Sequence, residues 1–138
     1  MGSAEAITKT ELPLQLLNRG KVRDNYLLNS NILMVATDRL SAFDVVFTEG
    51  IPWKGTVLTQ LSLSWFDFTK DIIPNHILLP NAPLGLLSKF PYLSHRSVLV
   101  KRTRVLPIEV VVRGYLAGSG WKDYQATGKV CGIDLPAG

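Results

Sequence analysis

Two cations stand at alternate positions at the start of one strand-like segment. Gly20 opens this segment, and Lys21 and Arg23 follow it. Side chains alternate between the faces of a strand, so Lys21 and Arg23 are expected on one face and Asp24 on the other. A glycine followed by cations on one strand face is chemically suited to cover a polyphosphate, as glycine-rich kinase hairpins do. An exposed, charged strand edge that discourages aberrant pairing is the alternative.

A second candidate site lies near the end of the chain. Arg113 follows a run of valines and precedes Gly114, so its guanidinium group emerges where a buried strand is expected to end. Arginine offers a bidentate fork to phosphate or carboxylate. Ser119 is predicted to be the N-cap of a short helix and to add a hydroxyl group and backbone donors. Pairing of Arg113 with Glu109 or Asp123 is the structural alternative.

A third cluster of polar residues surrounds Ser41. Asp38, Arg39 and Asp44 flank this serine in a predicted turn. Neighbouring carboxylates can position an amine, a hydroxyl group or a magnesium ion. Asp and Ser are also ordinary turn residues, so both interpretations stay open. Ser41 and Asp44 are the candidates for a substrate pocket.

The elements that must position these residues are mostly strands. Residues 21–28 and 32–37 form a predicted hairpin around Asn29-Ser30-Asn31, and residues 45–47, 97–105 and 108–113 are further strands. Apolar residues spaced by three and four predict an amphipathic helix that Pro74 ends; they are Leu58, Leu61, Trp65, Phe68 and Ile72. The pattern predicts an α+β lobe built on an antiparallel sheet.

Composition favours a folded protein with an anionic ligand. The 138 residues are 46% hydrophobic and carry a net charge of +4, and no acidic residue stands between Ile72 and Ile108. No apolar run reaches the ~18 residues of a membrane span, so a cytoplasmic location without membrane contact is expected. One cysteine and two distant histidines give no zinc-like spacing. Neither a Walker A loop nor a dinucleotide-binding glycine pattern is present.

Four segments together carry a family resemblance. They are Gly20-Lys21-Val22-Arg23-Asp24, Ala36-Thr37-Asp38-Arg39-Leu40-Ser41-Ala42-Phe43-Asp44, Gly50-Ile51-Pro52-x-Lys54-Gly55 with Leu58-Thr59-Gln60-Leu61-Ser62, and Val111-Val112-Arg113-Gly114-Tyr115-Leu116-Ala117-Gly118-Ser119-Gly120-Trp121. In type and order they resemble the SAICAR synthetase family of de novo purine synthesis. The resemblance runs from about Leu17 to Pro136.

The resemblance implies an ATP-dependent carbon–nitrogen ligase. In this family ATP activates the carboxylate of the aminoimidazole ribonucleotide CAIR, as an acyl phosphate, and the amine of L-aspartate then displaces phosphate to give SAICAR. ATP and Mg²⁺ are the implied cofactors. Gly20, Lys21 and Arg23 inherit the role of covering the ATP phosphates, and Lys101 and Glu109 lie near the nucleoside. Arg113 and Ser119 resemble the pair that holds the 5′-phosphate of CAIR.

The resemblance also implies a domain organisation. Residues 1–16 are expected to be an N-terminal extension, residues 17–106 an ATP-binding lobe, and residues 107–138 the truncated start of a substrate-binding lobe. The missing C-terminal half is the expected partner and the source of the magnesium ligands, so no metal site is expected here and the 138-residue chain is expected to be inactive alone. A homo-oligomer is left open.

The alternative to an enzyme is a non-catalytic basic module that binds a nucleotide or nucleic acid. In that interpretation the basic residues between 89 and 104 would track phosphates. Aromatic residues do not alternate with these cations, and no established RNA-binding or zinc-finger pattern appears, so no nucleic-acid partner is expected. A small kinase-like phosphotransferase would share the hairpin, but the chain has no HRD- or DFG-type motif.

Overall fold

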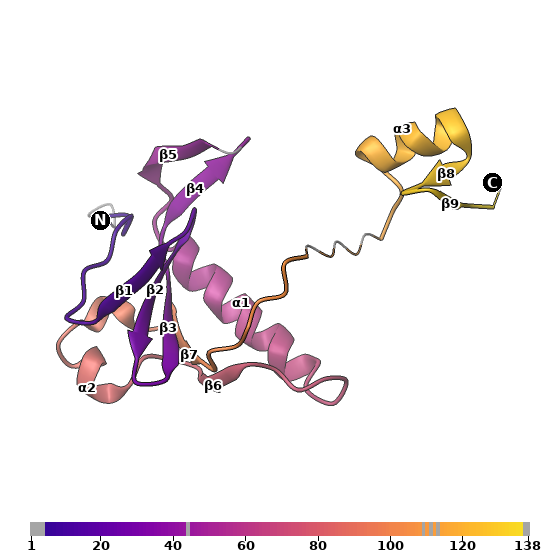
Figure 1. Ribbon diagram of the computed structural model, residues 1–138. Coiled ribbons are helices and arrows are strands. Elements are labelled where there is room, and N and C mark those ends of the chain that lie inside the picture. Colours follow the sequence, from indigo (N-terminus) through magenta and orange to yellow (C-terminus); the bar gives the residue numbers. More distant parts are fainter. Residues whose placement is uncertain (1–4, 44, 109, 111, 113, 137–138) are drawn as a thin grey trace. The chain divides into compact units, whose positions relative to one another are not determined.

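The chain folds into two compact units. The computed structural model describes residues 5–43, 45–108, 110, 112 and 114–136. The first unit is Met1–Arg104 and the second is Val105–Gly138. Figure 1 shows the first unit from indigo to orange and the second in orange to yellow. Each unit is described by itself.

A five-stranded antiparallel sheet forms the centre of the first unit. Its strand order is β1-β2-β3-β7-β6. The strands are β1 (Gln15–Arg19), β2 (Arg23–Leu28), β3 (Asn31–Ala36), β7 (Ser97–Val100) and β6 (Ile77–Leu79). The predicted hairpin is confirmed as β2–β3, with Arg23 opposite Ala36 and Leu28 opposite Asn31. Strand β1 was not predicted, and it places Gly20 and Lys21 in the turn that leads into β2.

One face of the sheet carries the apolar core. Tyr26, Leu33 and Val35 point to this face and pack with Ala82 and Leu93. The covering segment contains the short helix α2 (Leu84–Leu87) and the 3₁₀ turn η1 (Pro91–Leu93). Figure 1 shows α2 and α1 on opposite sides of the sheet. The alternation along β2 and β3 therefore separates a sealed face from a face that meets α1.

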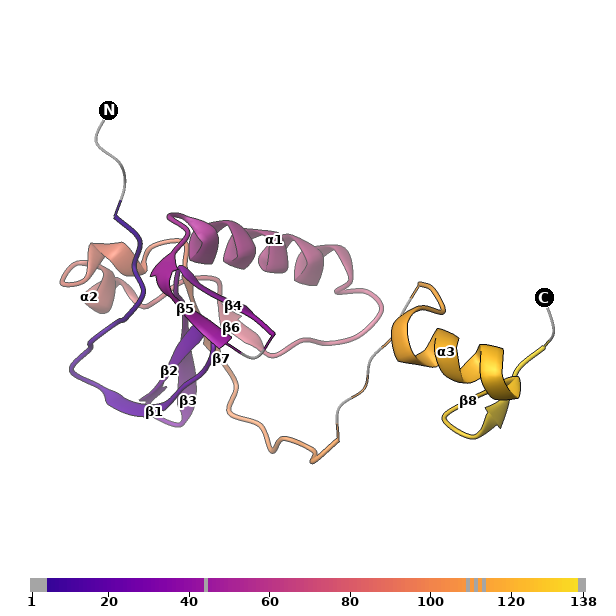
Figure 2. The same cartoon turned by 90° about the horizontal axis from the view of Figure 1, so that it is seen from above.

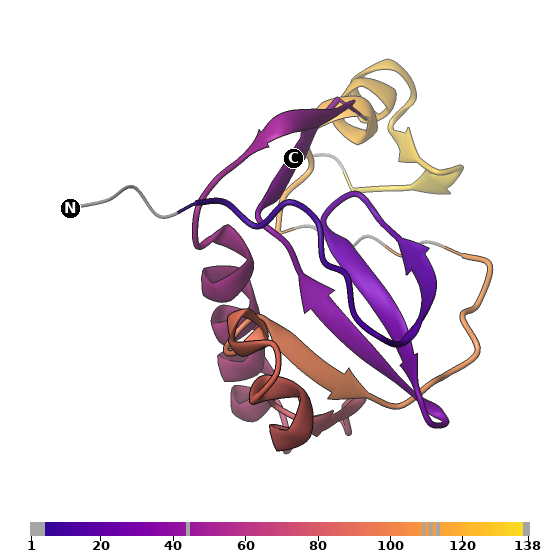
Figure 3. The ribbon, with the colours of Figure 1, turned by 90° about the vertical axis from the view of Figure 1, so that its left-hand side faces the viewer.

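Helix α1 (Lys54–Phe68) lies against the other face of the sheet. Gly55 allows the close approach, because a Cβ atom there would collide with the backbone of Ala36. Figure 2 shows the ribbon of β4 (Arg39–Ala42) and β5 (Val45–Gly50) leading into this helix, and Figure 3 shows the helix alongside the sheet.

The predicted buried face of α1 was wrong. Leu61, Trp65 and Phe68 are 53%, 59% and 75% exposed, respectively. Gly55 and Thr59 are buried instead, in line with the half-buried Leu63 and Phe66. The three-and-four spacing fits both faces, and close contact with β3 selects the face with the small residues. The helix also ends at Phe68, before the predicted limit near Ile72.

The Ser41 region is a strand and not a turn. Ser41 lies on β4, opposite Val46 of β5, in a separate two-stranded ribbon. The predicted strand at residues 45–47 is confirmed within β5. The missed strand begins with Arg39, whose neighbours Thr37 and Asp38 are also buried. Burial of three consecutive polar residues is invisible to hydrophobic periodicity.

The second unit is small and has little regular structure at its start. It contains α3 (Gly118–Thr127), β8 (Lys129–Val130) and β9 (Ile133–Asp134). β7 ends at Val100, so the strand expected to reach residue 105 is shorter. The strand expected over 108–113 is not seen at the residues of that range that the structure describes. The predicted short helix is confirmed, but Ser119 lies within it and not at the N-cap, which is Ala117.

Candidate functional site

The turn between β1 and β2 presents the first candidate residues. Gly20 N–H donates to the carbonyl oxygen of Arg23 at 2.8 Å, which closes the turn. The predicted alternation along β2 is confirmed, because Asp24 is fully buried whereas Arg23 is exposed. Arg23 therefore points to the same face of the sheet as α1.

A cavity of about 200 Å³ lies between this sheet face and α1. β2 and β3 contribute Arg23, Met34 and Ala36 to its wall, and α1 contributes an apolar side that includes Phe66. Lys54 and Arg96 also line it, so three basic residues surround one cavity. This combination of apolar walls and convergent cations suits a ligand with an aromatic part and an anionic part.

Lys54 occupies an electrostatically unfavourable position for a cation. It is the first residue of α1, where the helix dipole is positive and an acidic side chain would be stabilising. The first turn of α1 contains no acidic residue. A helix N-terminus with a nearby cation favours bound anions, so Lys54 strengthens the interpretation of the cavity as an anion site.

The Asp38 carboxylate organises the end of the cavity. It is fully buried, and its oxygens accept hydrogen bonds from Ile7 N at 2.9 Å, Gly55 N at 2.8 Å and Arg96 Nη1 at 2.9 Å. The bond to Gly55 caps α1 from a different element, since Trp53 at the N-cap position makes no side-chain cap bond. Asp38 thus fixes the helix, the N-terminal segment and Arg96 relative to the sheet.

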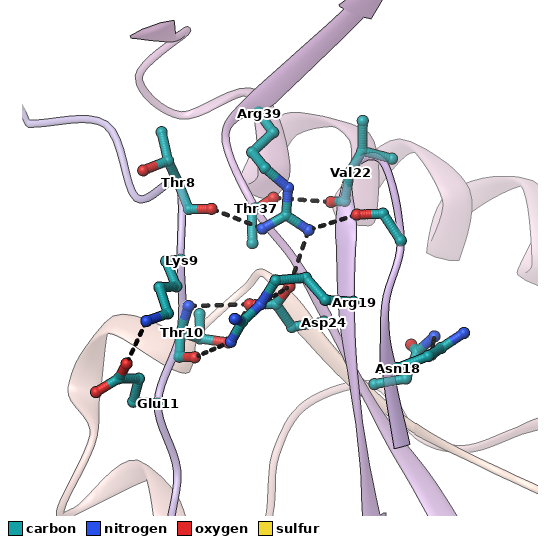
Figure 4. Close-up of polar contacts among 12 residues, drawn as sticks. Thr8, Lys9, Thr10, Glu11, Asn18, Arg19, Val22, Asp24, Thr37 and Arg39 are labelled. Atoms are coloured by element: carbon teal, nitrogen blue, oxygen red, sulfur yellow. Dashed lines mark hydrogen bonds and ion pairs between the residues drawn. The ribbon is translucent and has the colours of Figure 1, made fainter. Parts of the chain in front are cut away.

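A second buried carboxylate, that of Asp24, lies on the same face of the sheet as the apolar core, and Figure 4 shows its polar contacts. Asp24 accepts hydrogen bonds from Thr10 N and Oγ1, Arg19 Nε and Arg39 Nη2. Burial raises the pKa of Asp24, but the bonds from Arg39 and Thr10 outweigh burial and hold the pKa below its ordinary value of 3.8. The expected N-terminal extension, residues 1–16, supplies Thr10 and the first two residues of β1 to this region.

The two aspartates of this region therefore have a structural role as ion-pair partners of buried arginines. Asp24 and Asp38 each meet a buried guanidinium group and backbone N–H groups, which leaves neither of them open to a bound metal or substrate amine. The earlier alternatives for Asp38, an ordinary turn residue or a chemical group, are both replaced by this buried network. Among the described residues, no group of three His, Cys, Asp or Glu side chains could hold a metal ion.

The other predicted site residues are distributed unevenly. Lys101 is exposed just after β7, and its N–H donates to the carbonyl oxygen of His76 at 2.9 Å. Ser41 is half-buried in the β4–β5 ribbon, and Ser119 is exposed in the second unit. Asp44, Glu109 and Arg113 lie outside the described residues. The first unit thus brings Arg23 to the cavity without Ser41 or Lys101 in its wall.

Sequence reasoning missed Lys54 and Arg96 as members of the candidate site. Lys54 stands in the glycine-bounded Gly50 to Gly55 segment, which was one of the motifs of the family resemblance. Arg96 belongs to the stretch that lacks acidic residues. A signal was available for both residues, but only the packing of α1 on the sheet brings them together with Arg23.

The fold and the cavity define an α+β lobe with an antiparallel sheet and a cation-lined cavity between that sheet and α1. The family model of SAICAR synthetase matches residues 16–137, and the chain belongs to this family. The chain is 57% identical over 128 residues to phosphoribosylaminoimidazole-succinocarboxamide synthase of Thermodesulfovibrio yellowstonii, covering 91% of this chain and 44% of that protein. It is 54% identical over 139 residues to the enzyme of the same name from Geobacter sulfurreducens, covering 98% and 47%.

Solved structures agree with this assignment. A structure of SAICAR synthase from Saccharomyces cerevisiae complexed with SAICAR matches with a TM-score of 0.84 and 44% identity, covering 96% of this chain and 48% of that chain. A second SAICAR synthase structure matches with a TM-score of 0.85 and 45% identity. The predicted fold class and family are confirmed, and the chain spans about half the length of the relatives it matches.

No helix among the described residues is long and apolar enough to cross a membrane.

Proposed function

We propose that the protein acts in an ATP-dependent ligation that joins the carboxylate of CAIR to the amine of L-aspartate, giving SAICAR, ADP and phosphate. The observation that carries this proposal is the family match over residues 16–137. The solved relative complexed with SAICAR supports the choice of product. Activation of the CAIR carboxylate by ATP as an acyl phosphate would make it reactive toward the aspartate amine.

We propose that the first unit binds ATP, with the phosphates near Arg23 and Lys54. Both side chains line the cavity between α1 and the sheet, and Met34 and Phe66 supply apolar walls for the base. Gly20 and Lys21 would approach the phosphates from the β1–β2 turn. ATP, CAIR and aspartate are all anions, so a basic site lowers the cost of bringing them together.

The remaining residue roles follow the family resemblance and are proposals as well. Lys101 and Glu109 would lie near the nucleoside, Arg113 and Ser119 would hold the 5′-phosphate of CAIR, and Ser41 and Asp44 would contribute to the substrate pocket. The ATP-binding lobe would be residues 17–106, and residues 107–138 would open the substrate-binding lobe. The partner of this chain would be the rest of a family-length protein, and the protein would be located in the cytoplasm.

The two buried carboxylates of the first unit, those of Asp24 and Asp38, are not suited to bind magnesium. Asp24 and Asp38 are already satisfied by arginine and backbone donors. When bound with ATP, Mg²⁺ would neutralise phosphate charge. No step of the proposed reaction is assigned to these two aspartates.

Calorimetric titration of the 138-residue chain with Mg-ATP tests the nucleotide site. Arg23→Ala and Lys54→Ala should each weaken binding roughly 10- to 100-fold, the loss of one charge-assisted hydrogen bond. Lys70→Ala is the matched control. Lys70 lies just beyond the C-terminal end of α1, is exposed, and pairs with Asp67 of the last helical turn. Equal affinity in all four proteins would contradict the placement of the phosphates.

A titration with single-stranded oligonucleotide at two salt concentrations tests the non-catalytic alternative. Oligonucleotide binding that collapses with salt, with no saturable ATP binding, would favour a basic nucleic-acid module. Formation of SAICAR from ATP, CAIR and aspartate is a separate test, and the chain alone is expected to give none. Product formation by the purified chain would contradict the expectation that further protein is required.

A further inference from the structure

The Arg39 side chain joins two separate backbone segments and a buried carboxylate. Its Nη1 donates to the carbonyl oxygen of Thr8 at 2.6 Å, and its Nε donates to the carbonyl oxygen of Lys21 at 3.1 Å. Its Nη2 donates at 2.8 Å both to the carbonyl oxygen of Gly20 and to the Asp24 carboxylate. Figure 4 shows the Arg39 guanidinium group between Thr8 and Asp24. Arg39 is only 8% exposed, so the contacts are shielded from water.

These contacts set the direction of two consecutive peptide groups in the β1–β2 turn. The C=O and N–H of a trans peptide point in opposite directions, and both peptide bonds here are trans. Arg39 holds the carbonyl oxygens of Gly20 and Lys21 inward. The N–H groups of the same two peptides, which belong to Lys21 and Val22, must therefore point away from Arg39. Successive N–H groups that point the same way form an anion-binding concavity.

We propose that Arg39 is a positioning residue for nucleotide binding, and that it presets the backbone N–H groups of Lys21 and Val22 to donate to a phosphate of the nucleotide. This inference rests on the proposed function. Arg39 itself does not touch the nucleotide. Its effect is to order the turn before the ligand arrives, which removes part of the entropic cost of binding.

The Asp24 carboxylate does not by itself explain why Arg39 is present. Asp24 also accepts hydrogen bonds from Arg19 Nε and from Thr10, so it keeps partners when Arg39 is replaced. Among the described residues, Arg39 is the side chain that donates to the Gly20 and Lys21 carbonyl groups. Lysine would keep the charge near Asp24, but its single ammonium group cannot reproduce the planar set of donors.

The first measurement uses the unaltered chain and its backbone amide signals in ¹H–¹⁵N NMR spectra. Saturating Mg-ATP should shift the Lys21 and Val22 amide signals, and adenosine, which carries no phosphate, should not. ATP binding that leaves both amide signals unshifted would overturn the inference. A chain that binds no Mg-ATP at all would refute the proposed nucleotide site itself, and the positioning role with it.

The second measurement compares Arg39→Lys with Arg19→Lys. Arg19 also donates to Asp24 and to the Thr10 carbonyl oxygen, but not to the turn, so it is a matched control. Arg39→Lys should raise the Kd for Mg-ATP at least 10-fold and leave the Kd for adenosine within about 2-fold, whereas Arg19→Lys should change neither. If Arg39 had a purely structural role, Arg39→Lys would weaken the binding of both Mg-ATP and adenosine or of neither. Either result would overturn the inference. If Arg39→Lys does not fold, the amide signals of the unaltered chain decide.

Discussion

Replacing Asp38 by alanine should be among the most damaging single changes in the first unit. The carboxylate accepts hydrogen bonds from the N–H groups of Ile7 and Gly55 and from Arg96. The Asp38 side chain is fully buried and that of Arg96 is 5% exposed, so water cannot easily replace the lost oxygens. The change therefore leaves one buried cation and two backbone donors without an acceptor.

The magnitude follows from these three losses. Breaking a buried ion pair by removing one partner costs about 3–5 kcal/mol, and each unsatisfied backbone donor adds about 1–3 kcal/mol. Relaxation of the end of α1 recovers part of this, and we expect a net loss of about 5 kcal/mol in the free energy of unfolding. A domain of this size has about 5–15 kcal/mol in total, so Asp38→Ala should populate the unfolded state measurably.

Urea unfolding followed by circular dichroism measures this loss. Asp67→Ala is the control, because Asp67 forms an ion pair of similar length, 3.0 Å, with Lys70 on the exposed surface and should show no measurable loss. The double variant Asp38→Ala with Arg96→Met should recover at least about 2 kcal/mol, since it removes the unpaired charge. A loss below about 1.5 kcal/mol in Asp38→Ala, or a double variant no more stable than the single one, would refute the reasoning.

Three further predictions concern the stability of the same unit. The pKa of Asp24 is depressed in the folded state, so the contribution of this carboxylate to the free energy of unfolding is complete above pH 3.8 and is lost as the pH falls through the lower, folded pKa. In Asp24→Asn, the melting temperature should therefore fall less steeply with decreasing pH in this acid range than in the unaltered chain. Gly55→Ala should cost roughly 2 kcal/mol through collision with β3, and Gly85→Ala, which meets open space, should not lower the melting temperature. Leu33→Ala should cost about 2–5 kcal/mol in urea unfolding and the half-exposed Leu61→Ala much less; equal losses would contradict the assigned faces.

Local sequence patterns were sufficient for the hairpin. Asn29-Ser30-Asn31 between two β-rich runs predicts β2–β3, because turn preference and strand propensity act within a few residues. The same alternation placed Arg23 and Asp24 on opposite faces, which the structure confirms. The four motif segments, taken together, were also sufficient to identify the family.

Periodicity was insufficient where two faces of one helix competed. Leu61 and Trp65 are more hydrophobic than Gly55 and Thr59, yet the smaller pair is buried. Side-chain size decided this outcome, because only a glycine lets the helix backbone approach Ala36. The hydrophobic pattern of a single helix does not indicate which strand will pack against that helix, or on which face.

The sequence by itself determined the strand pairing of one hairpin and membership of the SAICAR synthetase family, since these depend on residue types at short spacing. Only the tertiary structure decided the role of the polar triplet Thr37-Asp38-Arg39. Asp38 meets Arg96 across 58 positions, and Arg39 meets Thr8 across 31. A charged side chain is stable in a buried position when folding brings its partner to it, and sequence spacing does not record that partner.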